Sequence, residues 1–273
     1  MQALELTARW PVAHVAAAVV LPDHSVATIG DMSLPYALAS VTKMLVGYTL
    51  LVAAEEGTLP LDAAAGQEGC TIRHLLAHAG GYGFDGATPI ARPGQRRIYS
   101  NTGIELAAQA LAEAAGMSFD DYLREAVLAP LGMTSSVLHG SPAHGLHSTV
   151  DDLVRFVHEL NAPQLVAPES ALAYRTVQFP GLAGIVPGIG RFSDCAWGLG
   201  TEIRGLKSPH WTGAANSPAT YGHFGGAGTL VWVDPGARTS LIALTDRPFD
   251  QWSDDALRHW PELADAVLAE VAR

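Results

Sequence analysis

The sequence predicts an α/β (α+β) fold in which one antiparallel sheet is built from both ends of the chain, with a helical region inserted between them. Three observations support this: apolar strand-like runs near the N-terminus, helical periodicity in the middle, and short β-rich runs after Trp197. Strands at both ends of a chain can bury their apolar faces by joining one sheet. We therefore expect a single domain over 1–273, with a sheet region at about 1–57 and 191–273 and a helical region at about 58–190.

The first elements are expected to be a β-hairpin and a long helix. The apolar runs His14–Leu21 and Ser25–Gly30 flank a Pro-Asp-His turn, which is typical of a hairpin. Ser40–Glu56 has apolar residues at helical spacing, and Gly57 follows where a C-terminal cap is expected. Ser40 thus opens the predicted helix.

The middle of the chain predicts further helices, and the last third predicts strands. The expected helices are Thr102–Ala115, Phe119–Val127 and Val150–Leu160. Their expected N-caps are Asn101 or Thr102, Ser118, and Ser148 or Thr149. The expected strands lie within Trp197–Arg204, Ala219–Phe224, Gly228–Val233 and Ser240–Thr245. A final helix, Asp254–Arg273, is expected to be interrupted by Pro261.

The composition limits the classes of partner. With 48% hydrophobic residues and 16% charged ones, the chain can build a sizeable core. A formal charge of −11 argues against nucleic acid and against an anionic membrane surface, since both need a cationic face. We therefore expect a small-molecule partner, no nucleic acid and no membrane, while the oligomeric state is not predicted.

The chain start and the cysteines indicate a cytoplasmic protein. Residues 1–10 lack the basic start and apolar stretch of a signal peptide. Cys70 and Cys195 have no CxxC or metal-type spacing, so reduced thiols are expected, and a disulfide between them only if the protein is exported.

The first candidate for chemistry is Ser40-Val41-Thr42-Lys43, an S-x-x-K sequence at the start of the predicted helix. Residues i and i+3 share a helix face, so the hydroxyl and the amine can come within hydrogen-bonding reach. A desolvated lysine can lose its charge and accept the serine proton. Alone, the tetrapeptide also fits a helix cap followed by an exposed lysine.

The second candidate is Tyr99-Ser100-Asn101, just before the next helix. A phenol beside a lysine can relay a proton, and the amide of Asn101 can orient that lysine or bind a substrate carbonyl. A buried tyrosine before a helix cap is the structural alternative.

The third candidate is the glycine-rich segment 221–228, which leads into a predicted strand. Residues without a side chain let a substrate approach the backbone, and a free N–H there can help to form an oxyanion hole. A dinucleotide-binding loop would open a helix instead.

Together the three motifs resemble the penicillin-binding-protein-like serine hydrolases, which include class C β-lactamases, D-alanyl-D-alanine peptidases and esterases. Other stretches agree and extend the similarity from about Ala13 to Thr245; they are 71–81, Pro130-Leu131-Gly132-Met133 and Ser148–Leu153. The resemblance implies the β-lactamase/transpeptidase-like fold and catalysis through an acyl-enzyme, with no metal and no organic cofactor.

The resemblance also implies roles for individual residues. Ser40 resembles the acylated nucleophile, Lys43 its base, and Tyr99 the residue that moves a proton to the leaving group. Three substrate-binding positions follow, namely Asn101 for the substrate amide, His223 at the third motif's basic position, and Gly225. The backbone N–H groups of Ser40 and Gly226 are expected to form the oxyanion hole.

One departure from the family pattern favours esters. His223-Phe224-Gly225 occupies the place where β-lactamases usually have Lys-Thr-Gly, so a permanent cation and a hydroxyl for a substrate carboxylate are both missing. A histidine is only partly charged at neutral pH. We therefore expect a carboxylesterase-type activity on small esters.

Alternatives stay open at this level. The same residues serve a β-lactamase, a D-amino-acid peptidase or amidase, an acyltransferase, or a non-catalytic acyl-binding protein. A metal hydrolase using His74 and His78 lacks an acidic base between the two histidines. A lipase-type α/β-hydrolase would need G-x-S-x-G, which is absent.

Overall fold

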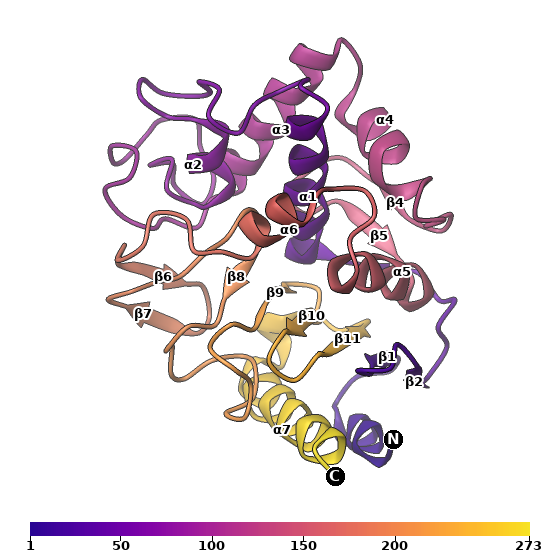
Figure 1. The fold of residues 1–273 in the computed structure, drawn as a ribbon. Helices are drawn as coiled ribbons and strands as arrows, with labels where there is room; N and C mark the ends of the chain where they lie inside the picture. The colour runs from indigo at the N-terminus through magenta and orange to yellow at the C-terminus, as the bar shows by residue number, and fades with distance from the viewer.

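The central feature of the computed structural model, which describes residues 1–273, is a six-stranded sheet in the order β2-β1-β11-β10-β9-β8 (Figure 1). Strand β1 pairs antiparallel with β11, with Val15 opposite Thr245, so the two ends of the chain form one sheet as predicted. The strands are β1 (Val15–Val20), β2 (Val26–Ile29), β8 (Glu202–Ile203), β9 (Tyr221–Gly225), β10 (Thr229–Asp234) and β11 (Thr239–Thr245).

Both faces of this sheet are covered. Alternate side chains of a strand point to opposite faces, and here they divide between two apolar clusters. Val231 and Val233 join the cluster under the helical region, whereas Leu230 and Trp232 join the cluster under the C-terminal helix α7 (Ser253–Val271). Figure 1 shows α7 beneath the sheet, beside the N-terminal 3₁₀ helix η1 (Gln2–Arg9), with the two termini close together.

The helical region lies on the other face of the sheet (Figure 1). Helix α1 packs against α3, α4 and α6 and is buried along almost its whole length, as expected for a helix with apolar residues on all sides. The elements here are α1 (Thr42–Glu55), α2 (Ile72–Leu76), α3 (Asn101–Ala115), α4 (Phe119–Leu123) with the π-turn η3 (Arg124–Leu128), α5 (Val150–Asn161) and α6 (Pro168–Tyr174).

Short elements complete the chain. Strands β3 (Tyr36–Ala37), β5 (Leu146–Ser148) and β4 (Val137–Leu138) form a small sheet, and β6 (Gly184–Val186) and β7 (Gly190–Phe192) form a hairpin. The two remaining elements are the 3₁₀ turns η2 (Ala39–Val41) and η4 (Phe249–Gln251). Neither the small sheet nor the β6–β7 hairpin is predicted from the sequence, because strands this short carry almost no periodicity.

Three local expectations are corrected. Helix α1 begins at Thr42, and Ser40 lies in the 3₁₀ turn before it. The N-cap of α3 is Ser100, whose Oγ accepts a hydrogen bond from the N–H of Gly103 at 2.9 Å, so Asn101 is inside the helix. Helix α7 continues through Pro261, since burial of its apolar face against the sheet outweighs one lost backbone hydrogen bond.

Other expected caps are confirmed, and the cysteines are free. Ser118 caps α4 and Thr149 caps α5, each through a side-chain oxygen that accepts a backbone N–H. Cys70 and Cys195 are both buried thiols. None of the helices is at once long enough and apolar enough to cross a membrane.

Candidate active site

Ser40 lies in the 3₁₀ turn that links β3 to helix α1. The residue before it, Ala39, has a φ of +46°, a left-handed conformation that residues other than glycine rarely adopt. Just after it, the Thr42 hydroxyl accepts a hydrogen bond from the N–H of Leu146 at 3.1 Å, which ties the start of α1 to β5. This constrained turn holds Ser40 at the wall of a cavity.

Lys43 lies one turn further along and is completely buried. Its Nζ is 3.2 Å from the Oγ of Ser40, and it donates hydrogen bonds to Oδ1 of Asn101 and to the backbone carbonyl of Ala143, each at 2.8 Å. Because both carbonyl oxygens can only accept, each one takes an N–H of the amine. The remaining position on Nζ faces the serine hydroxyl.

The charge state of Lys43 decides what that remaining position does. Burial lowers the pKa of Lys43 to about 7, although the carboxylates of Glu105 and Asp85 raise it in part. In the neutral amine, two N–H bonds point to the carbonyls and the lone pair points to Ser40. The geometry therefore suits acceptance of the serine proton.

The amide of Asn101 is held at both ends. Its Oδ1 accepts from Lys43, and its Nδ2 donates to Oδ1 of Asp85 at 3.2 Å. These two partners fix which way the amide points, since an amine donates and a carboxylate accepts. Asn101 thus orients the amine of Lys43; its predicted contact with a substrate amide stays a prediction.

Tyr99 precedes the cap of α3 and is 9% exposed. Its ring centroid is 4.8 Å from Nζ of Lys43, and its hydroxyl is 3.4 Å from Nε2 of His223. Burial raises the pKa of Tyr99 well above its ordinary value, and hydrogen bonding with the Ser40 side chain offsets only part of that. Tyr99 is therefore a neutral phenol between the serine and the histidine.

His223 is a neutral hydrogen-bond acceptor toward Tyr99. Its Nδ1 is 2.6 Å from the carbonyl oxygen of Phe224, so Nδ1 carries the proton and Nε2 presents a lone pair. Burial, helped by the positive charge of Lys43, lowers the pKa of His223 to about 3. The position that the family usually gives to a cation is thus uncharged here.

An aromatic cluster beneath Tyr99 was not predicted. The centroid of the buried His78 ring is 4.6 Å from that of Tyr99 and 4.5 Å from that of Trp197. Nδ1 of His78 accepts the N–H of Ser100 at 3.2 Å. The sequence drew attention to His78 through its spacing from His74 and its place in segment 71–81, and neither reveals contact with Tyr99.

The backbone at Gly225 and Gly226 approaches the Ser40 turn. A Cβ at Gly225 would lie 2.2 Å from the carbonyl oxygen of Leu38, so the close packing of the two segments requires glycine. Gly226 has open space beside it and lines the same cavity as Ser40. The N–H groups of Ser40 and Gly226 make no hydrogen bond within the protein, as oxyanion donors require.

The cavity at Ser40 has a volume of about 470 Å³, within the usual range for small-molecule sites. Its walls are largely apolar and come from Phe84, Val186, Trp197, Phe224, Phe249 and Leu257. Three carboxylates, Glu202, Asp250 and Asp254, also line it, whereas lysine and arginine do not. The cavity thus suits an apolar group and offers no cation to a substrate carboxylate.

The carboxylate of Glu202 belongs to a buried ion-pair network behind the cavity. Its Oε1 is 3.3 Å from Nζ of Lys207 and 3.2 Å from Nε2 of His210, and its Oε2 accepts from Nε1 of Trp211 at 2.7 Å. Burial alone would raise the pKa of Glu202, but the charges of Lys207 and His210 hold it at about 2. Glu202 is therefore ionised, and the sequence pattern did not identify it.

The two histidines considered for a metal have separate environments. His74 contacts the Thr71 hydroxyl through Nδ1 at 2.9 Å, and its ring stacks on Phe179 with centroids 4.2 Å apart. His78 packs under Tyr99, as described above. Each ring is thus explained by local packing.

The family model called Beta-lactamase matches residues 31–266. A protein of Escherichia coli O157:H7 with the name "Putative D-alanyl-D-alanine carboxypeptidase" is 24% identical over 315 aligned positions, which cover 84% of this chain and 72% of that protein.

Solved structures match the fold over 98% of this chain. The crystal structure of a β-lactamase from Mycobacterium bovis is 48% identical, with a TM-score of 0.95 over 98% of this chain and 99% of that one. EstCE1, described as a hydrolase with promiscuous acyltransferase activity, is 17% identical, with a TM-score of 0.76 over 98% and 96% of the two chains. At that level of identity, the likeness to EstCE1 concerns the fold alone.

Proposed function

This chain belongs to the beta-lactamase family, and from that membership we propose that it is a serine hydrolase that forms an acyl-enzyme on Ser40 and cleaves small esters of apolar acids. The observation that carries the choice of substrate is the lining of the cavity at Ser40. Its walls are apolar, its charged groups are carboxylates, and His223 at the third motif is neutral.

In the proposed first step, the Oγ of Ser40 attacks the ester carbonyl carbon while the neutral amine of Lys43 takes the hydroxyl proton. Negative charge develops on the carbonyl oxygen and is stabilised by the N–H groups of Ser40 and Gly226. Such a donor contributes about 3 kcal/mol where it has been removed from other enzymes. The hydrogen bonds to Asn101 and to the carbonyl of Ala143 keep the amine of Lys43 directed at Ser40 during this step.

In the proposed second step, the ester C–O bond breaks and the alcohol leaves with a proton from Tyr99. The phenol is a suitable donor because burial keeps it protonated, and the proton on Lys43 can replace the one that it gives up. Nε2 of His223 accepts this O–H in the resting site, so in this step the O–H rotates from His223 toward the leaving oxygen. Water then attacks the acyl group, passes its proton back through the same residues, and releases the acid and free Ser40.

A substrate with a carboxylate beside the scissile bond is disfavoured by electrostatics. Asp250 and Asp254 line the cavity without a salt-bridge partner, whereas the charge of Glu202 is offset by Lys207, and His223 of the third motif carries no charge. A substrate carboxylate beside these two carboxylates meets repulsion and no compensating cation. This supports the ester assignment over β-lactams and peptides that end in a carboxylate.

The test is hydrolysis of p-nitrophenyl butyrate and of a chromogenic cephalosporin by the wild type, Ser40→Ala and Ser253→Ala. Ser253 lines the same cavity without a place in the proposed machinery, so it is the matched control. We expect Ser40→Ala to lose ester turnover about a thousandfold or more, Ser253→Ala to keep it, and the cephalosporin to react far more slowly. Ester turnover that survives Ser40→Ala would refute the proposal, and faster cephalosporin turnover would replace it with a β-lactamase.

A second candidate is acyl transfer to an alcohol. The apolar cavity walls favour it, because an apolar alcohol competes well with water for such a surface. Product analysis with p-nitrophenyl butyrate and added butanol measures it directly. A butyl ester that forms at the expense of butyric acid supports transfer, and butyric acid alone supports hydrolysis.

A further inference from the structure

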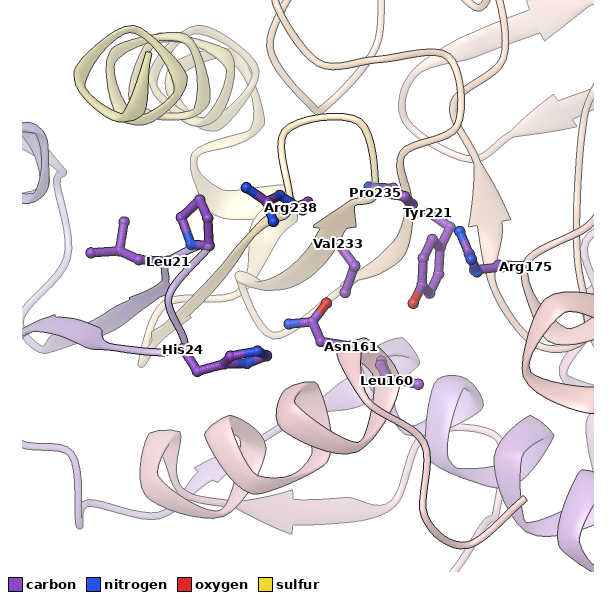
Figure 2. Close-up of a pocket in the computed structure, with 10 residues that line it drawn as sticks. Leu21, His24, Leu160, Asn161, Arg175, Tyr221, Val233, Pro235 and Arg238 are labelled. Carbon is purple, nitrogen blue, oxygen red and sulfur yellow. The ribbon is translucent and has the colours of Figure 1, made fainter. Parts of the chain in front are cut away.

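A second cavity, with a volume of about 270 Å³, opens at the end of strand β9 opposite to the active site (Figure 2). Tyr221, the first residue of β9, lines it, whereas His223 and Gly225 approach Ser40 further along the same strand. The remaining walls come from the β1–β2 turn, the end of β10, the β10–β11 turn, and the C-terminal ends of α5 and α6.

The charged side chains of this cavity are cationic. Arg175 and Arg238 line it from different sides, His24 is a third basic group, and no aspartate or glutamate is among the lining residues (Figure 2). Neither guanidinium makes a salt bridge, although the chain has 27 acidic residues and only 16 lysines and arginines. Two free arginines in a hollow without carboxylates create a local positive field in an acidic protein.

The hydroxyl of Tyr221 faces the same cavity and has no hydrogen-bond partner within the protein. Tyr221 is 2% exposed, yet its hydroxyl makes no hydrogen bond, and Figure 2 shows the oxygen pointing into the hollow beside Leu160 and Arg175. A ligand in the hollow can accept a hydrogen bond from this phenol, which has no partner within the protein.

Asn161 adds a second polar group to this wall. Its Nδ2 donates to the Ser240 hydroxyl at 3.3 Å, while its Oδ1 has no partner in the protein. A ligand between the two arginines therefore meets one hydroxyl donor and one amide acceptor. Guanidinium groups bind carboxylate and phosphate through paired N–H donors, so the anionic ends of a ligand would lie against the arginines.

We propose that this cavity binds a small molecule with two anionic groups, carboxylate or phosphate, held by Arg175 and Arg238, with a polar middle that contacts Tyr221 and Asn161. The volume lies just below the usual lower limit of about 300 Å³ for ligand sites, which favours a small metabolite over a nucleotide. The proposal is independent of the reaction at Ser40.

The test is calorimetric titration of the full chain with succinate, 3-phosphoglycerate and acetate at low salt. Succinate supplies two carboxylates, 3-phosphoglycerate supplies one carboxylate, one phosphate and a hydroxyl between them, and acetate is the single-charge control. We expect one molecule of succinate or 3-phosphoglycerate per chain, bound at least about tenfold more tightly than acetate, and the preferred probe distinguishes carboxylate from phosphate recognition.

Variants locate the site. Arg175→Gln and Arg238→Gln should each weaken binding about 10- to 100-fold, and Tyr221→Phe, which keeps the ring, should weaken it less. Arg191→Gln removes an exposed arginine from strand β7, outside this cavity, and should change nothing. Ser40→Ala should bind these ligands as the wild type does, because the cavity does not include Ser40. The binding result can therefore be interpreted even if the hydrolase proposal fails. Binding no tighter than acetate, or binding unchanged in both arginine variants, would overturn the proposal.

Discussion

The Nζ atom of Lys43 lies 3.2 Å from the Oγ of Ser40, and solvent reaches no part of that lysine. Two carbonyl oxygens take two of its N–H groups, which leaves one position for the serine. Whether that position holds a proton or a lone pair depends on a pKa that burial has brought to about 7. Reactivity and stability should both depend on this one group.

Ester hydrolysis is expected to rise with pH through about 7. The proposed base acts only as the neutral amine, so kcat/KM should increase as Lys43 loses its proton. His223, with a pKa of about 3, should add no inflection between about pH 5 and 9. A pH–rate profile with p-nitrophenyl butyrate measures this, and a profile that stays flat across pH 6 to 8 would contradict the assignment of Lys43.

The free energy of unfolding should also depend on the protonation of Lys43. The folded-state pKa of Lys43 lies below its ordinary value of 10.5. Burial of the charged amine therefore lowers the free energy of unfolding most below pH 7, and this loss disappears as the pH rises toward 10.5. The difference of about 3.5 pKa units corresponds to at most about 5 kcal/mol. Urea unfolding of the wild type and Lys43→Met should therefore show the wild type gaining stability relative to the variant over this range. Parallel curves would mean that Lys43 has an ordinary pKa.

Tyr99→Phe should lower kcat about 100- to 10,000-fold and change KM little, because it removes a proton donor and keeps the ring. Tyr82→Phe is the control, since Tyr82 is also buried but lies outside the cavity at Ser40. Steady-state kinetics on a phenyl ester and on an alkyl ester should separate the two roles of Tyr99. The loss should be larger for the alkyl ester, whose poorer leaving group depends more on the donated proton. Equal small losses in both tyrosine variants would exclude Tyr99 as the donor.

Substitution of Gly225 and of Gly226 by alanine should affect the stability of the fold differently. A Cβ at Gly225 would lie 2.2 Å from the Leu38 carbonyl and 2.4 Å from Oγ1 of Thr229, whereas a Cβ at Gly226 meets no atom within 4 Å. Gly225→Ala should therefore destabilise the fold by about 1–3 kcal/mol or more, and Gly226→Ala by much less. Thermal and urea unfolding compare the two. Similar unfolding free energies would mean that the β9–β10 turn does not pack against the Ser40 turn as described.

His223→Lys should improve recognition of carboxylate-bearing substrates. The substitution places a cation at the cavity wall where the family usually has one. We expect KM for a carboxylate-bearing ester to fall several-fold while KM for p-nitrophenyl butyrate changes little. Unchanged affinity for the carboxylate-bearing ester would show that this side chain does not face the substrate.

The local sequence determined the fold class, the order of the main elements and the motif residues. Apolar runs at both ends predicted a sheet that β1 and β11 do form, because each of these strands buries two apolar faces. The spacing of Ser40 and Lys43 placed hydroxyl and amine on one side of a helical turn, since that distance depends on local backbone geometry alone.

Only the tertiary structure decided the chemical state of those residues. The carbonyl of Ala143 and the amide of Asn101, both distant in sequence, hold the Lys43 amine, and His78 and Trp197 pack around Tyr99. The tautomer of His223 depends on its own strand, but its low pKa depends on burial by the helical region and on Lys43. Desolvation and long-range electrostatics follow from which distant segments meet, so no local pattern of residues could have supplied them.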